Sequence, residues 1–258
     1  MTRTLPSTVA IDGRWDDEPT PTYGQELLEL LRVVAVAGIG WGLVWVGLGS
    51  RLAMFLLRLT SPDDVRGVLS DDGFVIGRFT LSGTYNLAVV GAAIGVIGAA
   101  SYLAVAPWLI GPTWFRRFTV ALTSAAIGGS GTIHHDGIDF RALQPQSLAI
   151  GIFLALPFFF GLGLSTLVDR VGRRDSWTRR GATLWVLPLL LLLLTAANPL
   201  LGVPLTVGAI IAVLLPARRR FHQRIVASAT GTVVVRAFFL AIAVYSFSLL
   251  GMDLADFA

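Results

Sequence analysis

The chain contains no cysteine and no lysine, and only 14% of its 258 residues are charged. Without cysteine there are no disulfides, thiolate zinc sites, iron–sulfur clusters or thiol nucleophiles. Without lysine there is no Walker A phosphate loop, protein-kinase lysine, pyridoxal Schiff base or retinal Schiff base. Soluble domains typically carry about 25% charged residues, so the small charged fraction also argues against a soluble globule.

The chain is rich in apolar residues. Hydrophobic residues make up 54% of the chain, and the mean hydropathy is +0.72. This apolar total is enough for about seven membrane spans of roughly 20 residues each. The sequence therefore predicts an all-α, polytopic transmembrane helical bundle. Its richness in Arg, Ala, Gly, Val and Leu favours a high-GC bacterial genome, so we expect the bacterial cytoplasmic (inner) membrane.

Three regions follow from the distribution of polar residues. We expect a disordered cytoplasmic tail over residues 1–23, a single transmembrane helical domain over 24–250 and a short C-terminal tail over 251–258. No cleavable signal peptide is visible in the polar tail. The first span could continue as an interfacial turn or two over residues 52–59. The predicted spans are 33–50, 84–110, 118–133, 147–168, 182–197, 201–215 and 225–250.

The third predicted span, Phe118–Ile133, is the weakest. Its 16 residues rise only about 24 Å as a helix, but they carry no charge and follow Arg116 and Arg117 directly. We therefore favour seven spans with the N-terminus cytoplasmic, which places 14 arginines inside and 5 outside. If this stretch does not span, six spans remain with both termini outside, and the corresponding counts are 13 and 6.

The sequence pI near 10.3 reflects arginines that cluster at the ends of apolar runs. Such placement orients membrane spans and does not form the aromatic-laced basic stripe of a nucleic-acid interface. We expect no nucleic-acid partner. Two basic loops could also attract anionic lipid headgroups, although topology alone would explain them. The headgroup candidates are Arg173, Arg174, Arg179, Arg180, Arg218, Arg219 and Arg220.

Arg236 does not fit the sorting of charges to the two membrane faces. It lies 11 residues after Ile225 and 14 before Leu250, near the middle of the last predicted span. An arginine at that depth costs a few kcal/mol and usually faces a bundle interior or a wet cavity. It could pair with backbone carbonyls, with a polar side chain of another span, with water in a cavity, with an anionic solute or with an acidic residue of a membrane protein partner. Alternatively, the helix is shifted and Arg236 snorkels toward the basic loop 218–224.

Two polar loops share an Asp-Gly turn, and in the seven-span topology both lie on the outer face. They either form an acidic cap that collects a cation or a partner, or simply cap the following helices. No third ligand has metal-ligand spacing and no histidine is mid-span, so we predict no metal site, no haem and no other cofactor. The candidates for the cap are Asp71, Asp72, His134, His135, Asp136 and Asp139.

Glycine is abundant in the predicted spans. The segment 128–131 matches the G-x-S-G pattern of rhomboid proteases, but no later span supplies a histidine and His134 is only four residues from Ser130. Small residues at helical spacing more simply permit close helix packing. The glycines for which we predict such packing are Gly38, Gly42, Gly91, Gly95, Gly98, Gly161 and Gly163.

The segments Ser70–Tyr85 (SDDGFVIGRFTLSGTY) and Gly131–Phe140 (GTIHHDGIDF) resemble a set of uncharacterised multi-pass membrane proteins from actinobacteria. The resemblance covers about residues 50–170 and rests on the amino-acid sequences of the loops, not on a catalytic motif. It implies a membrane protein of that lineage, and it carries no functional residues across.

Three functional hypotheses remain. The first is a non-enzymatic membrane subunit or scaffold that packs against other helices or lipids, since the sequence shows no catalytic motif. The second is a small transporter or channel for an anionic solute, with Arg236 lining the path. The third is an intramembrane serine hydrolase that uses Ser130.

Overall fold

The computed structural model describes residues 23–62, 65, 67–68, 80–133, 137, 140, 142–173, 175–179 and 228–255. Within these ranges the chain is helical and contains no strand, which confirms the all-α prediction. The predicted spans 182–197 and 201–215 lie outside the described residues, as do the tail 1–22 and residues 256–258.

The first helix is continuous from Tyr23 to Thr60. It consists of α1 (Tyr23–Val33), two π-helical segments η1 (Val34–Ile39) and η2 (Gly42–Gly49), and α2 (Ser50–Thr60). The predicted span 33–50 and its continuation 52–59 are thus parts of one helix, which extends further at both ends. The wide π turns, which are uncommon in proteins, coincide with the stretch that meets the next helix most closely.

Four further long helices follow. Thr80 caps the first of them, because its Oγ1 accepts a hydrogen bond of 3.2 Å from the amide of Gly83. A single 3₁₀ turn, η4 (Ala106–Trp108), continues that helix, and another, η5 (Trp177–Arg179), follows the third. The long helices are α3 (Leu81–Val105), α4 (Thr113–Thr132), α6 (Gln146–Gly172) and α10 (Ala229–Ala255).

Among the described residues, four helices are long and apolar enough to cross a membrane. They are Leu28–Thr60, Leu81–Trp108, Gln146–Gly172 and Ala229–Ala255. The 20-residue helix α4 is not one of them, because Arg116 and Arg117, together with Thr, Ser and Gly, lower its mean hydropathy. The structure therefore supports a membrane-embedded helical protein, while the number of spans remains a prediction.

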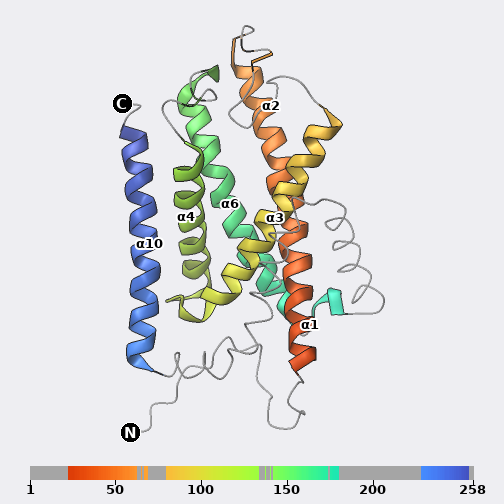
Figure 1. Ribbon diagram of the computed structural model, residues 1–258, viewed down its shortest axis with the longest axis vertical. Helices are drawn as coiled ribbons and strands as arrows, with labels where there is room; N and C mark the ends of the chain where they lie inside the picture. The colour runs from red at the N-terminus through yellow and green to blue at the C-terminus, as the bar shows by residue number, and fades with distance from the viewer. Residues whose placement is uncertain are drawn as a thin grey trace.

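Contacts between the helices fix their directions. Tyr102 at the end of α3 and Arg117 at the start of α4 both bind Asp169 near the end of α6. Gly129 at the far end of α4 packs against Leu154 in the first half of α6. Thus α3 and α6 run in the same direction, and α4 runs the opposite way and lies between α6 and α10 (Figure 1). α10 runs parallel to α4, because its last turns also reach Gly129, through Leu250.

The first helix and α3 meet backbone to backbone through glycine. A methyl group at Gly38 would lie 2.7 Å from the carbonyl oxygen of Gly95, and one at Gly42 would overlap the carbonyl oxygen of Gly91. Gly47 faces Ala88 in the same interface. The prediction of close packing from the glycine spacing is confirmed here, because only the absence of a Cβ lets the two backbones approach this closely.

Two tryptophans attach the first helix to α6. Trp41 and Trp45 stack with ring centroids 5.3 Å apart. Their indole N–H groups donate to the carbonyl oxygens of Phe160 at 3.0 Å and Leu156 at 2.8 Å. Gly163 leaves space for the Trp41 indole, since a Cβ there would overlap the ring. Each indole N–H is therefore satisfied inside an apolar interface, as burial requires.

Candidate functional site

Charged side chains gather at one end of the bundle, which we call the basic end. It contains the start of the first helix, the α3–α4 connection, the end of α6 and the start of α10 (Figure 1). The described arginines there are Arg32, Arg116, Arg117, Arg170, Arg173 and Arg236.

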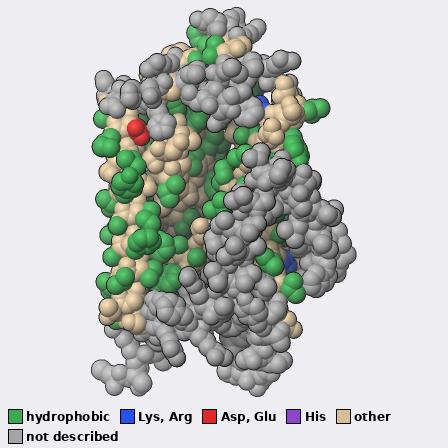
Figure 2. All heavy atoms as spheres, viewed as in Figure 1, with side chains coloured by type: hydrophobic (Ala, Val, Ile, Leu, Met, Phe, Trp, Pro, Cys, Tyr) green, Lys and Arg blue, Asp and Glu red, His purple; other side chains and the backbone are tan. Residues whose placement is uncertain are grey.

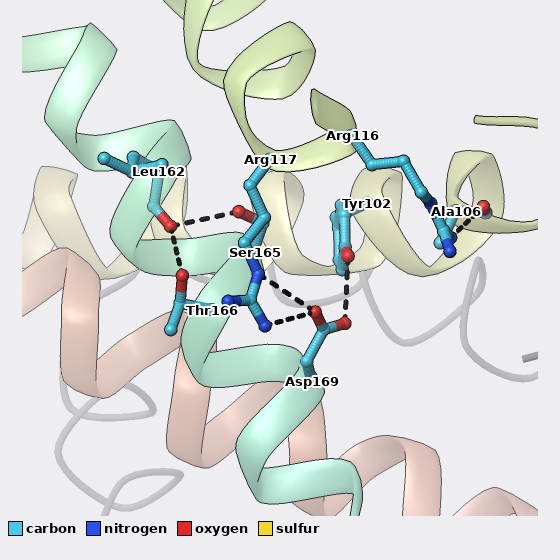
Figure 3. Close-up of polar contacts among 8 residues, drawn as sticks. All are labelled: Tyr102, Ala106, Arg116, Arg117, Leu162, Ser165, Thr166 and Asp169. Atoms are coloured by element: carbon cyan, nitrogen blue, oxygen red, sulfur yellow. Dashed lines mark hydrogen bonds and ion pairs between the residues drawn. The ribbon is translucent and has the colours of Figure 1, made fainter. Parts of the chain in front are cut away.

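A three-residue cluster joins three helices at the basic end (Figure 3). Arg117 of α4 forms an ion pair with Asp169 of α6, with 2.9 Å between Nη2 and Oδ2, and its Nε also donates to Oδ2 at 3.3 Å. The hydroxyl of Tyr102 on α3 donates to the other oxygen, Oδ1, at 2.9 Å. Both charged side chains are partly buried, with Arg117 25% and Asp169 31% exposed. One carboxylate therefore holds three helix ends together.

Two further arginines bind the short helix η4. Nη2 of Arg116 donates to the carbonyl oxygen of Ala106 at 2.6 Å (Figure 3). Nε of Arg236, on α10, donates to the carbonyl oxygen of Trp108 at 3.1 Å. The Trp108 ring also packs on Phe239 of α10, with centroids 6.4 Å apart. Guanidinium groups from α4 and α10 thus meet at the same turn.

This position bears on the two interpretations of Arg236. α10 begins at Ala229, so Arg236 lies in its second turn, level with the end of α3. The side chain is exposed and bonded to a backbone carbonyl. The geometry fits the interpretation in which the helix is shifted and Arg236 snorkels toward the basic end.

Arg32 is the most buried arginine among the described residues, at 3% exposure. Its Nη2 pairs with Glu29 at 2.5 Å, and its Nη1 donates to the hydroxyl of Thr178 at 3.0 Å. The Thr178 hydroxyl also lies 2.8 Å from that of Ser176. This network ties the turn after α6 to the first helix, so the role it supports is structural.

The predicted headgroup arginines are only partly described. Arg173 is exposed directly after α6, as an arginine available to lipid headgroups must be. Arg179 lies in η5, and nothing is described of its side chain. Outside the described residues lie Arg174, Arg180, Arg218, Arg219 and Arg220.

At the opposite end of the bundle, the described parts of the two polar loops meet. Ser61 follows the first helix, and its hydroxyl accepts a 2.8 Å hydrogen bond from the backbone amide of Gln144, just before α6. Val65 packs into one apolar cluster with the fully buried Ile133 and Phe140. The bases of the loops therefore lie together. The proposed cap residues themselves, Asp71, Asp72, His134, His135, Asp136 and Asp139, lie outside the described residues.

The G-x-S-G segment is in the last turns of α4. Ser130 donates its hydroxyl to the carbonyl oxygen of Ile127 at 3.2 Å, within its own helix. Gly128 packs against Pro157 of α6, where a Cβ would lie 2.6 Å from the proline Cβ. The structure thus supports the packing interpretation of this segment. His134, the base that a hydrolase would need, is not described.

The sequence analysis did not single out the cluster of Tyr102, Arg117 and Asp169. A usable signal was present, because Asp169 and Arg117 end apolar runs on the same side of the predicted membrane with opposite charges. In the described part of the chain, no group of three or more His, Cys, Asp or Glu residues is arranged to hold a metal ion. No protein family, curated protein or solved structure matches this chain.

Proposed function

We propose that the protein is a non-enzymatic subunit or scaffold of the bacterial cytoplasmic membrane that packs against other membrane helices. The observation that carries this proposal is the exposure of the apolar surface of α10. Only 11% of its most apolar window is buried, against 50% for the first helix and for α3. Hydrophobic side chains are exposed along the length of α10 (Figure 2).

The outward face of α10 is apolar and carries a line of small residues. Ala237, Ala241 and Ser248 are exposed and follow one another at spacings of four and seven residues, so they share one side of the helix. Ser246 and Leu250, each 7% exposed, lie on the opposite side. Exposed larger residues such as Val234 and Tyr245 flank the small ones. Small residues in such a stripe allow another helix to approach closely in a bilayer.

A matched pair of substitutions on α10 tests the proposal. Ala241→Leu enlarges the outward face and should abolish association with a partner while leaving the melting temperature unchanged. Ser246→Leu introduces the same side chain on the buried face, where overpacking costs about 1–3 kcal/mol. It should lower the melting temperature by about 3–10 °C. Light scattering in mild detergent measures association, and circular dichroism measures melting.

Two results would contradict the scaffold proposal. One is a wild-type particle containing a single 27.6 kDa chain and no other protein. The other is uptake of an anionic solute by liposomes that contain the wild-type protein, if the substitution Arg236→Leu abolishes this uptake. The second result would instead support a transporter in which Arg236 lines the path.

We further propose seven spans with the basic end in the cytoplasm. The proposal is supported by helix direction: α3 and α6 run the same way and α4 runs the opposite way, as expected if each of the three helices is a span. The hydroxyls of Thr119, Thr123 and Thr132 each donate to the carbonyl four residues earlier, so α4 can bury them in lipid. Both α6 and α10 also meet the basic end, which fits two further spans between them.

The absence of native cysteine permits a direct test of topology. Thr113 and Thr132 lie at opposite ends of α4. If the N-terminus is cytoplasmic and α4 spans, a membrane-impermeant maleimide added to intact cells should label Thr132→Cys but not Thr113→Cys. Ser228→Cys, just before α10, should also be protected until the cells are lysed. Labelling of both Thr113→Cys and Thr132→Cys in intact cells would favour six spans over seven.

A further inference from the structure

The short helix η4 brings together two arginines that are 120 residues apart in the sequence. Arg116 donates a hydrogen bond to the carbonyl oxygen of Ala106, and Arg236 donates one to the carbonyl oxygen of Trp108. These carbonyls are two residues apart in a 3₁₀ turn, about 4 Å along its axis. Each arginine reaches the turn from a different helix, so the guanidinium groups of α4 and α10 both bind the same short helix.

No carboxylate in the described part of the chain offsets the charge of these two guanidinium groups. Among the described residues, neither Arg116 nor Arg236 has an acidic group within ion-pair distance. The nearest described acid on this part of the surface, Asp169, is already bound by Arg117 and Tyr102. Nε of Arg116 is buried and has no described hydrogen-bond partner. An anion that accepts hydrogen bonds from both guanidinium groups would therefore offset two positive charges.

Aromatic residues place this pair at the depth of lipid headgroups. Trp108 supplies one of the two carbonyls, and Trp114, six residues later, is 68% exposed. Tryptophan is enriched at the boundary between the hydrocarbon core and water, where phosphate groups lie. Arginine suits phosphate because its planar fork can donate two parallel hydrogen bonds.

We propose that Arg116 and Arg236 form a binding site for a phosphate group, supplied by an anionic phospholipid headgroup or by free phosphate. This inference rests on the proposed membrane embedding and deepens it. The site connects α10 to the rest of the bundle, because the anion would bridge α4 and α10 across η4. Binding of the anion therefore stabilises the docking of α10.

The test compares thermal stability in a neutral detergent with and without a short-chain phosphatidylglycerol. With saturating lipid, the melting temperature of the wild type should rise by about 5 °C. Arg116→Gln and Arg236→Gln should each lose most of that rise, and the double variant should lose all of it. Arg170→Gln removes one charge from an exposed position in the last turn of α6, at the same end, and should keep the full rise. Because every variant is compared with itself, a lower starting stability does not obscure the shift.

Further measurements identify the source of the phosphate and define the results that would overturn the proposal. Inorganic phosphate at the same concentration identifies free phosphate as the ligand if it gives the same Arg116- and Arg236-dependent rise. An equal loss of the rise in Arg170→Gln overturns the proposal, since it would show only nonspecific attraction to a basic surface. A rise that persists in the double variant overturns it as well. Neither result affects the association test on Ala241, so failure of this site is distinguishable from failure of the scaffold proposal.

Discussion

Gly42→Ala is expected to destabilise the protein, whereas Gly40→Ala, two residues earlier, is expected to leave it unchanged or slightly more stable. A methyl group at Gly42 would overlap the carbonyl oxygen of Gly91, and neither backbone can move without separating the first helix from α3. At Gly40 nothing lies within 4 Å of the new methyl group. There the only effect is the higher helix propensity of alanine, which is worth up to about 1 kcal/mol.

The expected loss for Gly42→Ala is about 2–3 kcal/mol, as for an overpacked core, or about 5–10 °C in melting temperature. Gly95→Ala should behave in the same way, because its methyl group would overlap the carbonyl of Gly38. Circular dichroism melts of the three variants in one detergent provide the measurement. Equal melting temperatures for Gly40→Ala and Gly42→Ala would show that the two helices are not in backbone contact.

The apolar segments and the glycine spacing of the sequence predicted much of the interface between the first helix and α3. The sequence located a helix in each of the five predicted spans that fall within the described residues, and the glycines that meet across it were named in advance. It did not predict the π turns of η1 and η2, because the identity of the residues does not distinguish a π turn from an α turn. That choice depends on how the facing helix, α3, fits against this one.

Helix ends were harder to predict than helix cores, and this affected Arg236 most. The predicted span 225–250 placed Arg236 near mid-membrane, whereas α10 runs from Ala229 to Ala255. A shift of a few residues moves a side chain by several ångströms along the helix. The apolar run alone does not fix that shift, because it is set by the contacts of Trp108 with Arg236 and Phe239.

The polar cluster at the basic end could be predicted only in part. The predicted seven-span topology places Arg117 and Asp169 on the same side of the membrane, which makes an ion pair possible. It does not reveal that Tyr102 comes from α3 to the same carboxylate. That contact depends on α3 and α6 running in the same direction, with α4 running the opposite way.

Asp169→Ala is the second substitution with a large expected effect. It would leave both Arg117 and Tyr102 without the acceptor that they share. Hydrogen bonds to charged groups contribute about 1.5–3 kcal/mol, and partial exposure of this pair reduces the ionic part. We expect a loss of about 2–3 kcal/mol, which corresponds to about 5–10 °C in melting temperature. Tyr102→Phe, which removes one donor and leaves the ion pair intact, should cost only about 1 kcal/mol.

A double variant separates charge pairing from a general weakening of the bundle. Arg117→Leu and Asp169→Leu each leave one charge unpaired, whereas the combination leaves none, so the double variant should be less destabilised than the sum of the two single variants. Strict additivity of the three melting temperatures would show that the pair contributes no coupling. The ion pair also fixes the start of α4, the helix with the weakest apolar character. In Asp169→Ala, amide hydrogen exchange in the first turns of α4 should therefore become faster, because α4 loses its attachment at the basic end.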